Sequence, residues 1–128
     1  MSSPPDETLL IRAIAMPADA NPNGDNFGGW LMAQMGLAGG AHAFATAEGR
    51  VATVAVDPMT FHRPVQVGDQ VSCYCSTFRI GTTSIAVKVD TSVRRRHDWT
   101  EERVTEGVFT FVALDDSGRP RLVEGGLS

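Results

Sequence analysis

Asn23-Gly-Asp-Asn-Phe-Gly-Gly-Trp30 joins a loop to a long apolar segment, and this junction decides how the chain is organised. Before it, residues 16–26 are rich in Pro, Asn, Asp and Gly, which is typical of a loop. After it, the segment from Phe27 to about Ala47 is rich in Ala, Leu and Met and predicts a helix. Asp25 or Asn26 can cap this helix by accepting a hydrogen bond from one of its first N–H groups.

The predicted helix is apolar on nearly all sides, whereas a helix at a protein surface has a polar stripe. Its large and small apolar residues are Trp30, Leu31, Met32, Met35, Leu37, Ala38, Ala41 and Phe44. This pattern predicts a helix that is buried on most sides.

Short apolar or alternating runs surround the helix and predict five strands. These runs are Leu9–Ala15, Val51–Val56, Val71–Phe78, Ser84–Thr91 and Val104–Leu114. The order indicates the α+β class, with a curved antiparallel sheet wrapped around one long central helix. One such sheet covers only part of the helix, so a dimer that extends the sheet is expected. We expect one domain over residues 9–122, with flexible ends at 1–8 and 123–128.

The bulk composition is that of an ordinary globular domain: 128 residues, 42% apolar, with a net charge of -4. The negative charge gives no general attraction to nucleic acid or anionic membranes. No apolar run is long enough to span a membrane, and the N-terminus does not resemble a signal peptide. Cys73 and Cys75 lie two residues apart in a predicted strand and therefore point to one face, which disfavours a disulfide between them. These features predict a cytoplasmic protein with reduced thiols.

Glycines at the helix start have two possible explanations. Gly28 and Gly29 lower helix propensity, but they allow a ligand to approach the backbone closely. N–H groups at a helix start can bind an anion or polarise a carbonyl oxygen. The alternative is tight packing of helix on sheet. The same two explanations apply to Gly36, Gly39 and Gly40, where packing is favoured.

Four stretches resemble the signature regions of YciA-type acyl-CoA thioesterases: Ala15–Met35, Val51–Asp69, Ile80–Ser84 and Glu106–Ala113. The resemblance runs through residues 9–122 without large gaps. It implies the hotdog fold and hydrolysis of acyl-CoA to a free acid and coenzyme A, a reaction of fatty acid metabolism that uses no metal or other cofactor. It also implies dimers, usually assembled into hexamers, with each site built across the dimer interface.

The resemblance also implies site residues. Gly28 and Gly29 supply the N–H that polarises the thioester carbonyl, and Asp25 lies beside them as a catalytic residue. Substrate-binding positions are Asn23, Phe27, Arg50, Thr53, Gly81, Thr82, Thr83 and Ser84, the last four along the path of the pantetheine and phosphates.

Gly36 is the main departure from the family, which usually has its catalytic Asp at this position. Glycine cannot act as a general base or nucleophile, and general-base assistance is typically worth about 10² to 10⁴ in rate. Three explanations stay open: a weak enzyme that relies on Asp25, an inactive variant of a thioesterase, or a non-catalytic acyl-CoA binding protein. Another hotdog chemistry, hydration of an enoyl thioester, normally needs an Asp and His pair, which the sequence does not offer.

The other charged and titratable candidates have weaker signals. The run Arg94-Arg95-Arg96-His97 is expected to be a solvated hairpin end, the alternative being a contact with coenzyme phosphates. His42 is expected to be a core or interface residue, and His62 a possible neighbour of the coenzyme. The His and Cys spacings do not suggest a metal site.

Overall fold

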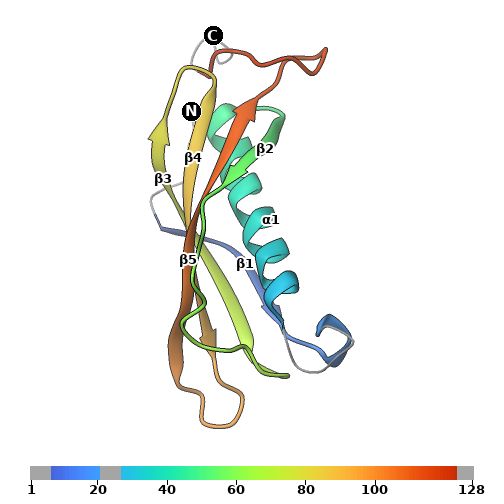
Figure 1. Ribbon diagram of the computed structural model, residues 1–128, viewed down its shortest axis with the longest axis vertical. Coiled ribbons are helices and arrows are strands. Elements are labelled where there is room, and N and C mark those ends of the chain that lie inside the picture. The colour runs from blue at the N-terminus through green and yellow to red at the C-terminus, as the bar shows by residue number, and fades with distance from the viewer. Residues whose placement is uncertain (1–6, 21–26, 124–128) are drawn as a thin grey trace.

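The computed structural model describes residues 7–20 and 27–123 (Figure 1). In chain order its elements are β1 (Thr8–Ile14), the 3-10 turn η1 (Pro17–Asp19), α1 (Gly28–Ala47), β2 (Val51–Val56), β3 (Gln70–Ile80), β4 (Ser84–Arg94) and β5 (Glu101–Ala113). Within these residues the strands form one antiparallel sheet in the order β1-β3-β4-β5-β2. The helix α1 runs along one face of this sheet (Figure 1), which confirms the predicted fold class.

Glycines of α1 face the phenyl rings of β5. A Cβ added at Gly36 would lie 3.7 Å from Phe109 Cε2, and one at Gly39 would lie 3.3 Å from Phe111 Cε1. Gly40 also faces the Phe111 ring. Both rings are almost fully buried, at 3% and 1% exposed. The structure therefore supports the packing explanation at Gly39, where an added Cβ would be too close, whereas Gly36 and Gly40 leave room for ordinary contact.

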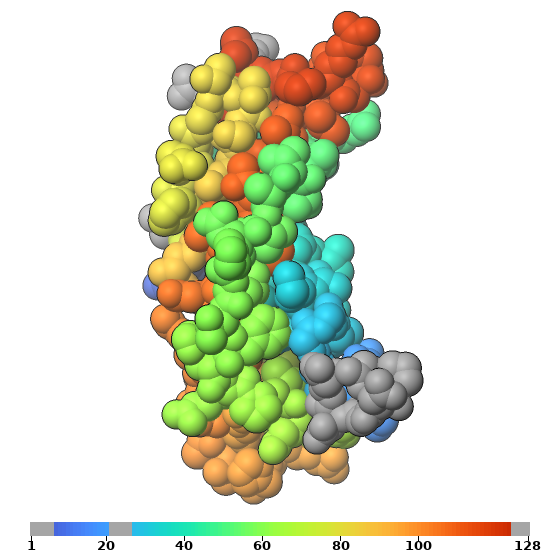
Figure 2. All heavy atoms as spheres, viewed as in Figure 1, coloured from blue at the N-terminus to red at the C-terminus, as the bar shows by residue number. Residues whose placement is uncertain are grey.

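One side of the molecule remains apolar and uncovered. Met32, Leu37 and Phe44 of α1 are exposed, as are Val54 and Val56 of β2. In Figure 2 the green residues of β2 and the cyan residues of α1 lie on the same visible face. In a single chain the helix is therefore covered on one side only. The predicted burial on most sides is wrong for one chain alone.

The strands β4 and β5 are longer than the predicted runs Ser84–Thr91 and Val104–Leu114, and at the hairpin they reach Arg94 and Glu101. Arg94 and Glu101 are cross-strand partners, with an Nη2–Oε1 distance of 3.0 Å. Opposite charges in this position support strand pairing. Because β4 and β5 pair as far as these two residues, the turn between them is shorter than predicted.

Arg95 is buried, so the prediction of a solvated hairpin end is wrong at this residue. It continues the buried alternation of Val89, Thr91 and Val93 one step further. Burial acts to lower the pKa of its guanidinium, but hydrogen bonds with Glu102 and Asp69 raise that pKa overall. Arg95 is therefore a charged residue inside the fold rather than a surface cation.

The ends of the described chain are ordered parts of the fold. Thr8 begins β1, and Val123 is buried, with its N–H donating to the Thr82 carbonyl at 3.0 Å. The outer parts of the predicted flexible ends, 1–6 and 124–128, lie outside the described residues. No helix in 7–20 or 27–123 is both long and apolar enough to cross a bilayer.

The two cysteines point to the same buried face of β3, as predicted from their spacing. Both thiols are free and fully buried, and the Thr91 hydroxyl lies 3.6 Å from Cys73 Sγ. Burial, together with the nearby Cys73 and Asp90, raises the pKa of Cys75 from 9.0 to about 12. Burial also raises the pKa of Cys73.

We expect these thiols to make folding stability fall in alkaline solution. The folded pKa of Cys75 lies above its unfolded value, so its contribution is complete below pH 9.0 and is lost as the pH rises toward about 12. Between pH 8 and pH 10 this loss is about 1 kcal/mol. Denaturant unfolding of the protein and of Cys75→Ala measures it: the variant should lose less stability over this interval. Equal losses would show that the Cys75 thiol does not carry the effect.

Candidate active site at the start of the central helix

The helix α1 begins at Gly28, with Phe27 as its N-cap residue. Phe27 has no side-chain oxygen and makes no capping bond of its own. The prediction that Asp25 or Asn26 caps this helix concerns residues outside the described ranges and stays a prediction. The predicted site residues Asn23 and Asp25 lie outside the described residues, as does Asn26.

Phe27 anchors the helix start. Its side chain is 3% exposed and its ring meets Trp30 edge-on, with centroids 6.0 Å apart. Its carbonyl accepts the Leu31 N–H at 2.8 Å, which closes the first helical turn. Phe27 is thus fixed by packing on the inner side of the site.

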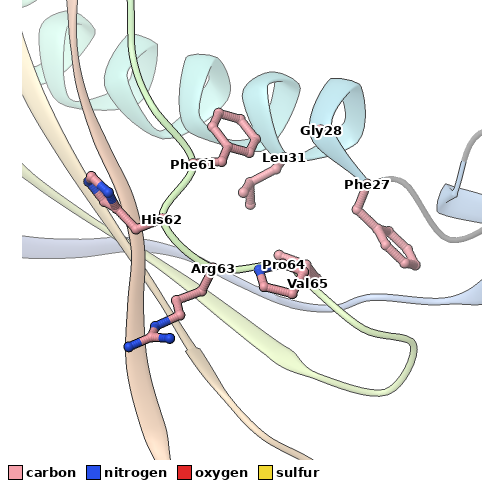
Figure 3. Close-up of a pocket in the computed structure, with 8 residues that line it drawn as sticks. All are labelled: Phe27, Gly28, Leu31, Phe61, His62, Arg63, Pro64 and Val65. Atoms are coloured by element: carbon pink, nitrogen blue, oxygen red, sulfur yellow. The ribbon is translucent and has the colours of Figure 1, made fainter.

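A pocket of about 360 Å³ opens beside this helix start (Figure 3). One wall comes from α1 and the other from the irregular segment 57–69. The lining residues are Phe27, Gly28, Leu31, Phe61, His62, Arg63, Pro64 and Val65. In Figure 3 Phe61 and Leu31 point toward each other across the pocket. Most of the lining is apolar, which suits a hydrocarbon chain.

Gly29 leaves the approach to the helix start open. A Cβ added there would meet nothing within 4 Å, and the first turn carries no acidic residue. The first N–H groups of a helix have no acceptor inside it, and the helix dipole makes this end positive. The open glycine and the dipole together suit a carbonyl oxygen that gains negative charge during reaction.

Gly36 lies two turns further along α1 and is half-buried. Its nearest neighbour, Phe109 Cε2, is at ordinary van der Waals distance from an added Cβ. Packing therefore does not require glycine here. A carboxylate side chain at this position would meet no steric obstacle at its Cβ.

Of the remaining predicted binding residues, all but Thr53 lie at the opposite end of the molecule. Arg50 follows the C-terminal end of α1, and its carbonyl accepts the Leu114 N–H at 2.9 Å. The turn that carries Gly81, Thr82, Thr83 and Ser84 lies at this end too, since the Ala113 N–H donates to the Thr83 carbonyl. Thr53 lies in β2, exposed. A 20-residue helix is about 30 Å long, so one chain does not unite these residues with Gly28.

Arg50 also lines a hollow of about 420 Å³ at this end, together with Phe44, Glu48, Gly49, Leu114, Asp115, Asp116 and Arg121. The guanidinium of Arg121 donates to the Ala47 carbonyl at 2.8 Å and to the Leu114 carbonyl at 3.0 Å. A cation at a helix C-terminus is stabilising. Arg121, which the sequence did not single out, thus has a structural role at the end of α1.

The histidines differ in their surroundings. His42 is fully buried in α1, and its Nε2 lies 2.9 Å from Thr77 Oγ1, as expected for a core residue. His62 is exposed, and its backbone N–H donates to the Val104 carbonyl at 2.7 Å. In Figure 3 its ring points away from Gly28. In the described residues, no three His, Cys, Asp or Glu side chains are grouped as a metal site requires.

The sequence did not identify the wall of the pocket formed by Phe61, Pro64 and Val65. This segment lies within the signature stretch Val51–Asp69, but the prediction singled out only His62 in it as a neighbour of the coenzyme. The sequence did offer one signal for Arg95, which follows Val89, Thr91 and Val93 at the same two-residue spacing and so falls on their face at the end of β4.

Comparison with known proteins places this chain in a family. Residues 23–95 match the model of the thioesterase superfamily. The acyl-CoA thioester hydrolase YciA of Salmonella typhimurium is 46% identical over 124 residues, which is 94% of this chain and 93% of that protein. The Escherichia coli protein of the same name is 46% identical over 120 residues, 91% of each chain.

Solved structures agree. The crystal structure of HI0827, a hexameric broad specificity acyl-coenzyme A thioesterase, has a TM-score of 0.87 and 45% identity, covering 94% of this chain and 83% of that chain. The hexameric thioesterase y2039 from Yersinia pestis has a TM-score of 0.85 and 49% identity, covering 93% and 97%. A hexameric hotdog fold thioesterase of Campylobacter jejuni has a TM-score of 0.85. The chain therefore belongs to the thioesterase superfamily, as a hotdog-fold relative of the YciA acyl-CoA thioester hydrolases.

Proposed function

We propose that this protein hydrolyses acyl-CoA thioesters to a free carboxylic acid and coenzyme A. The observation that carries the proposal is the open helix start beside an apolar pocket, in a chain 46% identical to YciA hydrolases over most of its length. The apolar walls suit the acyl chain, and the helix start suits the thioester carbonyl. Water is the second substrate, and the reaction needs no metal or other cofactor.

The reaction begins with attack of water on the thioester carbonyl carbon. The carbonyl oxygen becomes an oxyanion, which the N–H groups at Gly28 and Gly29 stabilise, while a base takes a proton from the water. The intermediate then collapses, the carbon–sulfur bond breaks, and the coenzyme A sulfur takes up a proton. Removing one such oxyanion donor typically costs about 10² to 10³ in rate.

Asp25 is the proposed base, or the group that positions the water, because Gly36 has no side chain to do this. We expect turnover to be slow for the same reason. A non-catalytic acyl-CoA binding protein is less favoured, because the relatives that match over most of the chain are named as hydrolases. The one observation that supports a binding protein is that residue 36 is a glycine and carries no carboxylate.

The complete site requires a second copy of the chain. The helix start and the group at Arg50 and Gly81–Ser84 lie at opposite ends of one chain. A partner that continues the sheet beyond the edge strand β2 would cover the exposed apolar residues of α1 and β2. It could also bring its own far end to the first chain's helix start. We propose this dimer, with three dimers in a hexamer, as the thioesterases of known structure are hexameric.

We propose that the protein works in the cytoplasm. Its two buried cysteines are free thiols, which suits a reducing compartment.

The first prediction concerns turnover and Gly36. Release of the coenzyme A thiol from a panel of acyl-CoAs should be measurable but slow for the protein as it is. Gly36→Asp should raise kcat by about 10² or more, because it adds the missing carboxylate where a Cβ fits. Gly36→Ala is the matched control and should change kcat little. No thiol release from the protein or from Gly36→Asp would contradict a hydrolase.

The second prediction concerns Asp25. In the unchanged Gly36 background, Asp25→Ala and Asp25→Asn should each lower kcat by about 10². The asparagine variant preserves shape and hydrogen bonding but not the charge, so it separates base catalysis from positioning. Unchanged turnover in both variants would remove Asp25 from the mechanism.

The third prediction concerns assembly. Light scattering should give a mass of six 13.7 kDa chains for the protein. Leu37 is 62% exposed in one chain, so Leu37→Asp should place charge in the interface and yield smaller species. Leu37→Met keeps the residue apolar and should assemble normally. A Leu37→Asp hexamer would show that this helix face is not an interface.

A further inference from the structure

A buried ion pair lies beneath the outer wall of the pocket. Arg95 Nη1 is 2.7 Å from Asp69 Oδ2, and the two side chains are 6% and 1% exposed. Arg95 Nε donates to Glu102 Oε2 at 2.7 Å. Burying two charges costs several kcal/mol, and well-packed apolar residues often give equal or higher stability. Stability alone is therefore a weak explanation for this pair.

The ion pair holds the stretch of backbone that lines the pocket. Arg95 Nη1 also donates to the Pro64 carbonyl at 2.8 Å, and Asp69 Oδ2 accepts the Gln66 N–H at 2.9 Å. Pro64 has no N–H, so its carbonyl is its only backbone group that can form a hydrogen bond. Val65 is buried and lines the pocket. The residue before it, Pro64, is hydrogen-bonded to Arg95, and the residue after it, Gln66, is hydrogen-bonded to Asp69.

This stretch cannot rely on regular secondary structure. Residues 57–69 contain no helix or strand. The earlier part of the segment is hydrogen-bonded to β5. The Thr105 hydroxyl donates to the Thr60 carbonyl, and the His62 N–H donates to the Val104 carbonyl. At Pro64 to Gln66, the Arg95–Asp69 pair supplies the hydrogen bonds to the backbone instead. A guanidinium suits it because its rigid fork binds several acceptors at fixed angles.

We propose that Arg95 is a positioning residue: through Asp69 and the Pro64 carbonyl it holds the 61–66 wall opposite Gly28 and so sets the affinity of the pocket for acyl-CoA. The inference rests on the proposed function. Arg95 does not touch the substrate in this proposal. It acts through Pro64 and Val65, which line the pocket and contact the substrate.

The test compares Arg95→Met with Arg94→Met in the full-length protein. Arg94 is the matched control, since it is the next residue in the same hairpin but binds Glu101 and the Trp99 carbonyl instead. Arg95→Met should raise KM for an acyl-CoA about tenfold, the equivalent of one charge-assisted hydrogen bond, with kcat changed less. It should also speed amide hydrogen exchange in residues 61–67. Arg94→Met should change neither quantity.

A double variant separates positioning from stability. Asp69→Leu with Arg95→Met removes both buried charges and should recover most of the stability that Arg95→Met loses. It leaves the Pro64 carbonyl without its donor, so KM should stay high and exchange fast. If KM returns to normal together with stability, Arg95 is only structural and the proposal is wrong.

The exchange measurement distinguishes this inference from the proposed function. Absence of thiol release and of coenzyme A binding in the unchanged protein would overturn the function, and the affinity part of the inference with it. Unchanged exchange at residues 61–67 in Arg95→Met would overturn the positioning itself, whatever the activity. Faster exchange with normal KM would show that the wall moves without affecting the substrate, which also contradicts the proposal.

Discussion

The contact between the glycines of α1 and the phenyl rings of β5 fixes the distance between helix and sheet. At Gly39 even a methyl group would lie 3.3 Å from Phe111, closer than most side-chain contacts. This short distance sets where the helix begins relative to segment 57–69, and therefore the width of the pocket at Gly28. The site depends on this packing, because a helix further from the sheet would leave Leu31 and Phe61 apart.

Gly36 belongs to the same row of glycines but is under less packing constraint. Its added Cβ would be 3.7 Å from Phe109, an ordinary contact. Packing thus explains Gly39 better than Gly36. The absence of a carboxylate at Gly36 is consequently a chemical feature of this protein rather than a requirement of its fold.

Two kinds of interaction hold the two walls of the pocket. The helix wall is held by apolar packing, with Phe27 and Leu31 buried against the core. The opposite wall has irregular backbone, whose polar groups need partners when they leave solvent. Arg95, Asp69 and strand β5 supply those partners. Apolar packing tolerates small shifts, whereas hydrogen bonds to a guanidinium fix direction as well as distance.

The sequence by itself determined the fold class, the approximate positions of the helix and the five strands, and the shared face of the two cysteines. These properties follow from local periodicity and residue preference, which nearby residues fully specify. Only the tertiary structure decided that Arg95 is buried against Asp69, that Phe61 to Val65 form the second wall, and that Arg50 and Gly81–Ser84 lie far from Gly28 in one chain. These relations join residues distant in sequence, and they depend on strand register and on the length of a rigid helix, which no local pattern reports.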